Sequence, residues 1–520
     1  MRLNIVGDRR ALLGVSAHVA ANVVVAASTL LTPALLVPIL GLDGFAFIAF
    51  YLHLAVFLLL FDFGLSGLLM RQLAEFCGHD HKGTSIHAVA NLGRNVEGLY
   101  WAIGLLLGIT LFAAAGPIAQ HWLKISPPSV DRAAHIVRFM AIAFIFHWPL
   151  FLYQNALIGL GRQIEVSILS GTAAIARLAA GYVVASWSVD VGAYFGALAF
   201  CNLVIIVIVY IAYHRTLVHI GILLSKSAVS VWEVVRYRGY ALPLALIMML
   251  GYLLVSVDRL LAAKILPLNQ YAEYSIVCTI SQGISLATSA VVGASLPRLV
   301  QAFSRLDRRA YQESFFVGQL AVCVVCVPIY VAVAFYPGPL LELVAGHKIE
   351  SKNLYYALVI HSSGTLAHTL MVLSFAAHQS QQQLLRWLVM TSVLALCALG
   401  FAILFRPDWG IVGLAYFWLS ICVMQMFIGV AISSRLRYHG LSPVGVGRLL
   451  TYFVQIAAGI GSGYLTFVAL KEYSSNFLIT VSVTAGASFL AVSSFMLVAT
   501  KMFEFLYPGP VGDKEKGMPG

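Results

Sequence analysis

Apolar runs of about 20 residues recur along almost the whole chain, and they constrain its fold more than any other feature. Each run is long enough to cross the roughly 30 Å hydrocarbon core of a membrane as a helix. Of the 520 residues, 60% are hydrophobic and only 10% are charged, whereas soluble proteins carry about 25% charged residues. The sequence therefore predicts an all-α polytopic membrane protein.

We count fourteen such runs between residues 14 and 502, the first two at 14–38 and 44–68. An even number places both termini on one side of the membrane. With the N-terminus cytoplasmic, most of the 32 Lys and Arg residues fall in cytoplasmic segments, as the positive-inside rule requires. The formal charge of +11 then reflects this rule and attraction to anionic lipid, not nucleic-acid binding. The first run lacks the cleavage site of a signal peptide, so we expect it to be retained.

The two halves of the chain resemble each other. The segment ILGLDGFAF (39–47) aligns with ILPLNQYAE (265–273), and RQLAEF (71–76) aligns with RLVQAF (298–303) after a shift of one residue. Six spans per half give both halves the same topology. We therefore predict two pseudo-symmetric six-helix lobes, related by an axis along the membrane normal and enclosing a cavity.

This repeat divides the chain into five predicted parts. They are an N-lobe (1–213), a cytoplasmic amphipathic linker (214–238), a C-lobe (239–438), two added C-terminal helices (439–504) and a disordered cytoplasmic tail (505–520). The linker prediction rests on its basic residues and on Trp232, which suit a helix lying at the membrane surface.

The chain lacks the common signatures of enzymes. It contains no P-loop, HExxH motif, nucleophile elbow or clustered metal-ligand spacing. Cys323 and Cys326 have the spacing of a redox motif, but they lie in an apolar helix, where packing is the expected role. We expect a transporter with no cofactor and no metal.

Four segments carry a family resemblance. They are FDFGLSGLLMRQLAE (61–75), VDRLLAAKILPLNQYAEYS (257–275), SLPRLVQAFSRLDRRAYQE (295–313) and GIVGLAYFW (410–418). Together they resemble the polysaccharide (O-antigen and exopolysaccharide) flippases of the multidrug/oligosaccharidyl-lipid/polysaccharide exporter superfamily. That superfamily also contains drug extrusion transporters, which usually have twelve spans, and the lipid II flippase.

The resemblance implies a protein of the bacterial inner membrane with both termini cytoplasmic. It would flip undecaprenyl-diphosphate-linked oligosaccharide to the external leaflet by alternating access, for lipopolysaccharide or exopolysaccharide biosynthesis. Membrane lipids, a polysaccharide polymerase and glycosyltransferases are the expected partners, and any coupling ion would be H⁺ or Na⁺. The resemblance also implies that the lipid tail rides outside, along a groove lined by the last two spans.

Three arginines are candidates for binding an anionic headgroup, because Arg can bind a phosphate through two parallel hydrogen bonds. Arg177 lies in mid-span, where an isolated charge suggests function, although an ion pair with a carboxylate on a neighbouring helix is the alternative. Arg259 can line the cavity, or it can snorkel to the external interface or gate the lobes. Arg94 can contact the headgroup or pair with Glu97, three residues further along its helix.

Five residues are candidates for ion coupling: Asp62, Asp258, His53, His147 and His368. Asp62 precedes a glycine that loosens the second span. It can bind H⁺ or Na⁺, or pair with a basic residue of a neighbouring span. Asp258 can instead cap a helix or pair across the lobes. The histidines can carry protons or form hydrogen bonds between helices.

The aromatic residues near span ends suggest membrane-interface belts. We expect Tyr271, Tyr274, Trp122 and Trp187 to take this role.

Two other functions stay open. An ion-coupled multidrug or cation antiporter of the same fold would need acidic residues in its cavity, and it would be expected to lack the last two spans. A membrane polymerase or glycosyltransferase would need a long external loop with catalytic residues or a soluble sugar-nucleotide domain, and the sequence shows neither.

Overall fold

The structure is a computed structural model, and it describes most of the chain. The described residues are 5–77, 86–123, 125, 129–222, 232, 238–346, 351–381, 384–404, 407–434, 446–470 and 477–506. They form helices and turns, with no strand among them. Within this part, 13 helices are long and apolar enough to cross a membrane. The first of these contains two of the predicted spans, so the described helices account for all fourteen.

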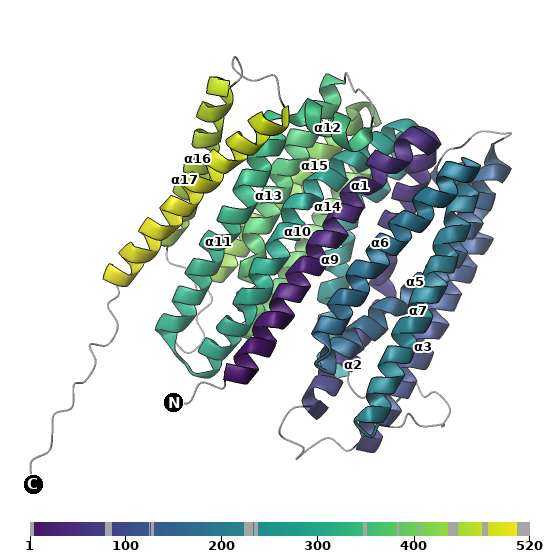
Figure 1. Cartoon of the computed structure of the whole chain (residues 1–520), viewed down its shortest axis with the longest axis horizontal. Coiled ribbons are helices and arrows are strands. Elements are labelled where there is room, and N and C mark those ends of the chain that lie inside the picture. The colour runs from purple at the N-terminus through teal and green to yellow at the C-terminus, as the bar shows by residue number, and fades with distance from the viewer. Residues whose placement is uncertain are drawn as a thin grey trace, which may run out of the picture.

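The N-terminal helices form one lobe (Figure 1). They are α1 (Ile5–Leu58), η1 (Leu59–Asp62), α2 (Leu65–Cys77), α3 (Ile86–Ala113), α4 (Ala115–Pro117), η2 (Ile118–Trp122), α5 (Val130–Gly159), α6 (Gln163–Ser188) and α7 (Val191–His219). Gly41 divides α1, because its φ of 73° and ψ of 173° are not helical. A glycine adopts this conformation without steric cost, and the chain reverses there between the first two spans.

The second lobe follows with corresponding elements. It contains α9 (Arg238–Ile265), α10 (Leu268–Ser304), α11 (Arg308–Phe335), α12 (Pro337–Ala345), α13 (Lys352–Ser380), α14 (Leu384–Leu404), η3 (Pro407–Trp409) and α15 (Gly410–Ser434). The turn at Leu266-Pro267 joins α9 to α10, as the break at Gly41 joins the first two spans. The aligned segments of the predicted repeat therefore both lie at a reversal of the chain. We call the end of the bundle that holds these two turns the hinge end.

The first half of α1 lies between the lobes. It packs against α6 on one side and α10 on the other, and Figure 1 shows it crossing the bundle between the two groups of helices. The first span is therefore well placed to take part in any movement of one lobe against the other.

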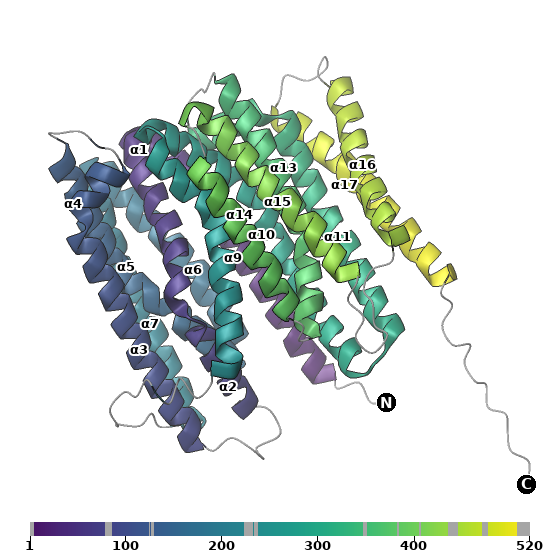
Figure 2. The same ribbon diagram turned by 180° about the vertical axis from the view of Figure 1, so that it is seen from behind.

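The last two helices lie outside both lobes (Figure 2). They are α16 (Val446–Leu470) and α17 (Phe477–Leu506), which pack against each other and against α11. Close approach is possible because α16 has glycines at this contact. A Cβ at Gly459 would lie 2.7 Å from Val327 Cγ1 on α11, closer than side-chain packing permits.

The structure does not test three of the sequence predictions: the linker, the tail and the lipid groove. The predicted linker lies mostly among residues that the structure does not describe, although Trp232 is described and exposed. The predicted tail is outside the described residues except for its first two. The expected lipid groove along the last two spans stays a prediction.

Candidate functional site

The N-lobe contains a small membrane-embedded cavity of about 240 Å³. Its wall is formed by α1 residues from Leu52 onward and Leu59 at the start of η1, by α5 residues between Phe144 and Gln154, and by Arg177 from α6. Most of this wall is apolar, so the guanidinium of Arg177 is its one charged group if His147 is neutral. The cavity is therefore a low-dielectric site in which a single positive charge has a strong effect.

A neutral amide holds Arg177 in place. The Arg177 Nε donates to Asn202 Oδ1 on α7 at 2.7 Å, and Asn202 Nδ2 donates to the Ala143 carbonyl on α5 at 3.1 Å. Asn202 is fully buried, so its side chain is fixed by these two bonds. The structural alternative predicted for Arg177, an ion pair, is not formed: no carboxylate of a described residue lies within 4 Å of its guanidinium.

His147 lies in the same cavity. Its Nδ1 is 3.0 Å from the hydroxyl of Tyr51 on α1, so one ring nitrogen is used to fix the ring between two helices. Of the eight candidates from the sequence, Arg177 and His147 are the two that this cavity brings together.

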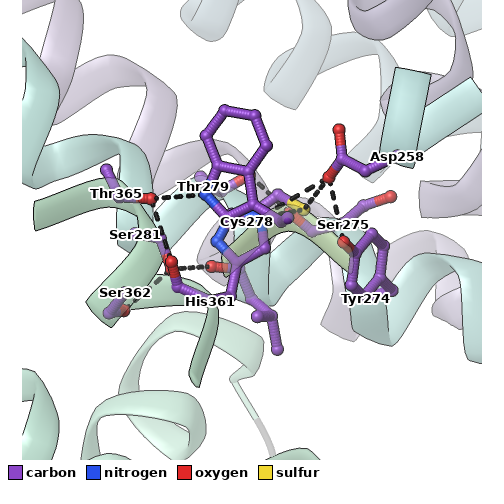
Figure 3. Close-up of polar contacts among 11 residues, drawn as sticks. Asp258, Tyr274, Ser275, Cys278, Thr279, Ser281, His361, Ser362 and Thr365 are labelled. Atoms are coloured by element: carbon purple, nitrogen blue, oxygen red, sulfur yellow. Dashed lines mark hydrogen bonds and ion pairs between the residues drawn. The ribbon is translucent and has the colours of Figure 1, made fainter. Parts of the chain in front are cut away.

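A second polar cluster is buried in the C-lobe, as Figure 3 shows. Asp258 on α9 accepts a hydrogen bond from the Tyr274 hydroxyl at 2.9 Å, and its Oδ2 lies 3.5 Å from His361 Nε2 on α13. The Cys278 Sγ on α10 lies 3.5 Å from the same histidine nitrogen. The His361 ring stacks on Trp418, with centroids 5.4 Å apart. Three helices are thereby joined through one carboxylate.

Arg259 follows Asp258 in the chain but turns toward a different partner. The side-chain amide of Gln282, with its oxygen facing Arg259, accepts from both terminal nitrogens at 2.6 and 2.7 Å. Arg259 is 3% exposed, so it does not snorkel to the membrane surface as one of the predicted alternatives had it.

Three polar or cation–π contacts between side chains of the described residues join the lobes. Asn22 Nδ2 on α1 donates to Ser289 Oγ on α10 at 3.2 Å. His53 Nδ1, on α1, lies 2.9 Å from the Tyr271 hydroxyl on α10, and both side chains are buried. Nearer the hinge end, Lys264 lies 5.8 Å from the ring centroid of Trp122, within the range of a cation–π interaction. The lobes are therefore in contact at the hinge end and also, through the first half of α1, further from it.

Of the remaining candidates, Asp62 and Arg94 lie apart from the cavity and the C-lobe cluster, whereas the His368 ring lies 6.1 Å from the Trp418 ring of that cluster. Asp62 ends the helical part of the second span, where Phe63 and Gly64 both have positive φ. Its Oδ1 accepts from the Ser66 backbone N–H at 3.3 Å and so caps α2. The helix is broken at this glycine, as the sequence suggested.

Arg94 is exposed and does not pair with Glu97, which corrects the predicted ion pair. Glu97 is buried and instead accepts from the Tyr153 hydroxyl at 2.6 Å, with His214 Nε2 at 3.2 Å. The two residues point to different environments although they are three positions apart. His368 lies 3.1 Å from the Gln425 side-chain oxygen.

Some important residues were missed or misassigned from sequence. Asn202 and Cys278 gave no signal beyond being polar or sulfur-containing residues in apolar spans. The interface-belt assignment of Tyr271 and Tyr274 is wrong, because these side chains are 1% and 0% exposed and hydrogen-bonded inside the bundle. Trp187, at 86% exposed, is in keeping with a belt position.

Comparisons with known proteins give the fold. No protein-family model and no curated protein sequence matches the chain. Among solved structures, the chain is similar to the lipid II flippase MurJ in its inward closed conformation, with a TM-score of 0.70, 11% identity, and 94% of this chain and 99% of that chain covered.

Two multidrug transporters have the same architecture. The MATE multidrug transporter DinF-BH gives a TM-score of 0.63 at 13% identity, covering 83% of this chain and 96% of that chain. An inward-facing MATE transporter of the MOP superfamily gives 0.58 at 13% identity, covering 89% and 100%. The chain therefore has the all-α fold of MOP-superfamily transporters, as the sequence resemblance implied.

Proposed function

We propose that this protein moves a lipid-linked oligosaccharide with an anionic diphosphate headgroup across the membrane by alternating access. The observation that carries the proposal is Arg177: a guanidinium in a membrane-embedded cavity, held by the neutral Asn202 and without a carboxylate neighbour in the described chain. A buried charge in a membrane is costly enough that an uncompensated one implies an anionic ligand.

The geometry of Arg177 suits a phosphate group. Its Nε–H is used on Asn202, and its two terminal nitrogens donate to no residue that the structure describes. These nitrogens carry four N–H donors in a planar fork, which matches two phosphate oxygens. A lysine would supply the charge but not the fork.

The contacts between the lobes suggest which state the structure represents. If the N-terminus is cytoplasmic, the hinge end faces outward, and the His53–Tyr271 contact closes that side. The substrate would then enter from the cytoplasmic leaflet, and the two lobes would separate at the hinge end to release it outside. The diphosphate would be shielded from hydrocarbon by Arg177 while the lipid tail stays in the bilayer.

The coupling ion, if the transport uses one, is H⁺ or Na⁺ in this proposal. Asp62 and Asp258 are the candidates of greatest interest because both are buried carboxylates in the spans. A multidrug or cation antiporter is the rival function. It is less well supported because the charged residue lining the N-lobe cavity is basic rather than acidic.

The test uses cells of the source organism that lack the gene, with or without the wild-type gene restored. The leaflet occupied by diphosphate-linked oligosaccharide is determined by labelling its sugars from outside. We expect the lipid to accumulate on the cytoplasmic face of the deletion strain and to return to the outer face on complementation. Normal outer-face display in the deletion strain, with no second carrier, would contradict the proposal.

A further inference from the structure

The buried cluster of Asp258, Cys278 and His361 has the donor set of a metal site. The three side chains are 0% exposed and come from three helices, α9, α10 and α13. One carboxylate oxygen, one sulfur and one imidazole nitrogen lie within 4.8 Å of one another. We propose that these residues bind one Zn²⁺-like divalent cation, separately from the substrate path through Arg177, which leaves Asp62 as the buried carboxylate available to a coupling ion.

The distances fit such an ion. Asp258 Oδ2 and His361 Nε2 are 3.5 Å apart, Cys278 Sγ and His361 Nε2 are 3.5 Å apart, and Cys278 Sγ and Asp258 Oδ2 are 4.0 Å apart. A point equidistant from the three atoms lies about 2.1 Å from each, close to the Zn–N and Zn–O distances of about 2.0–2.2 Å and slightly under the Zn–S distance of about 2.3 Å. An ion displaced slightly out of this plane satisfies all three, with little movement of the ligands.

One oxygen of the carboxylate also lacks a hydrogen-bond partner. Asp258 Oδ2 accepts from Tyr274, but Asp258 Oδ1 has no hydrogen-bond partner among the described residues. No nitrogen of Arg259 lies within 4 Å of this carboxylate, since its guanidinium is directed to Gln282. The buried guanidinium of Arg259 acts on this carboxylate through space, but the unpaired oxygen has no direct contact with a cation, and a buried oxygen in this state favours one.

The neighbouring residues orient the ligands. Tyr274 holds Asp258 in place through its hydroxyl, and Trp418 stacks on the His361 ring at an interplanar angle of 14°. Contacts of this kind fix the orientation of metal ligands in known sites. The neutral imidazole supplies Nε2, and the Cys278 thiol releases one proton when its sulfur binds the ion.

The choice of ion follows from the ligands. Thiolate and imidazole together favour zinc-like ions, whereas Na⁺, Mg²⁺ and Ca²⁺ prefer oxygen. A divalent ion with one carboxylate and one thiolate carries no net charge of its own, and the buried guanidinium of Arg259, which acts on both ligands, adds one positive charge beside it. The bound ion would tie α9, α10 and α13 together and stiffen the C-lobe while leaving the contacts between the lobes unchanged.

The test measures metal on the purified full-length protein after removal of any affinity tag. Metal-free protein is loaded with Zn²⁺ or Co²⁺, passed through a desalting column and analysed for metal content. We expect one ion per chain. For Co²⁺ we also expect a near-ultraviolet sulfur-to-cobalt band.

Three variants make the result specific. Cys278→Ser replaces the sulfur with oxygen and should remove the sulfur-to-cobalt band. It should also weaken Zn²⁺ binding by more than about 100-fold, which exceeds the loss seen when residues that only orient the ligands are changed. His361→Gln should also lose the ion. Cys326→Ser alters another buried cysteine, which contacts Thr288 instead, and should bind like wild type.

Several results would overturn the proposal. They are the absence of retained metal in correctly folded wild type, a cobalt spectrum without the sulfur band, or unchanged binding by Cys278→Ser. Absent metal binding would assign the compensation of Asp258 to Arg259 and His361. Thermal unfolding of each variant without metal identifies any that fail to fold.

Discussion

Replacing Arg177 tests the proposed headgroup site in the most quantitative way. The structure leaves its two terminal nitrogens available while Nε is fixed on Asn202. A bidentate contact with a phosphate makes two charge-assisted hydrogen bonds, each worth about 1.5–3 kcal/mol. Since part of this energy is lost in desolvation, we take a net loss of about 3 kcal/mol for Arg177→Ala, which is roughly a 150-fold weaker affinity.

The conservative variant refines the prediction. Arg177→Lys keeps the charge but loses the fork and the bond to Asn202, so we expect a loss of about 1.5 kcal/mol, or roughly tenfold. Asn202→Ala should have a similar effect, because the guanidinium loses the group that positions it. Arg94→Ala removes an exposed arginine outside the cavity and serves as the control with an equal change in charge.

The assay is equilibrium binding of a purified diphosphate-linked oligosaccharide to each variant in detergent, at fixed ionic strength because salt screens charges. The reasoning predicts the order wild type and Arg94→Ala, then Arg177→Lys, then Arg177→Ala. Equal affinities for wild type and Arg177→Ala would refute it, as would an equal loss with Arg94→Ala. In either case Arg177 would have a structural role only.

Three further predictions concern packing and the contact between lobes. His53→Phe removes the hydrogen bond to Tyr271 and should favour opening at the hinge end by about 1 kcal/mol, which is roughly a fivefold change in the ratio of open to closed protein. Spin-label distances across the lobes measure this ratio. Adding Tyr271→Phe to this variant should have little further effect, because the same hydrogen bond is already lost. Gly459→Val should displace α16 and lower the midpoint temperature of thermal unfolding. Gly461→Val is the control and should leave the midpoint unchanged, because a Cβ added at Gly461 meets no atom within 4 Å. Equal midpoints for the two variants would count against the described α16 contact. Glu97→Gln keeps the shape of the side chain but replaces the carboxylate beside His214 with a neutral amide. It should lower the free energy of unfolding of the N-lobe by about 1–3 kcal/mol, which denaturant unfolding measures. An unchanged free energy of unfolding would show that the contact between Glu97 and His214 does not need the carboxylate.

The sequence was sufficient for the membrane spans because their signal is local. Apolar length alone predicts a crossing, and the helices α3 to α17 lie close to the predicted runs. Arg177 was also identifiable, since a charge inside an apolar run is conspicuous without any knowledge of its neighbours. The break at Gly41 lies in the gap between the first two predicted runs, although the sequence did not single out that residue.

The polar partners were not predictable in the same way. Asn202 is 25 residues from Arg177, and His361 is 83 residues from Cys278. Such contacts depend on the rotation of each helix about its axis and on its neighbours, neither of which a single sequence specifies. Tyr271 was misassigned for this reason: its place near a span end indicated an interface, but its face of α10 is turned toward His53.

The central claim is transport of a diphosphate-linked oligosaccharide, and reconstitution tests it most directly. The purified protein is placed in liposomes that contain this lipid in both leaflets, and an impermeant enzyme outside cleaves the exposed sugar. We predict that wild-type protein makes the inner-leaflet lipid accessible, that Arg177→Ala does so much more slowly, and that protein-free liposomes protect it. The account would be contradicted if the inner-leaflet lipid stays protected with correctly oriented wild-type protein under either an H⁺ or a Na⁺ gradient. Efflux of a cationic dye from the same liposomes would favour the antiporter instead.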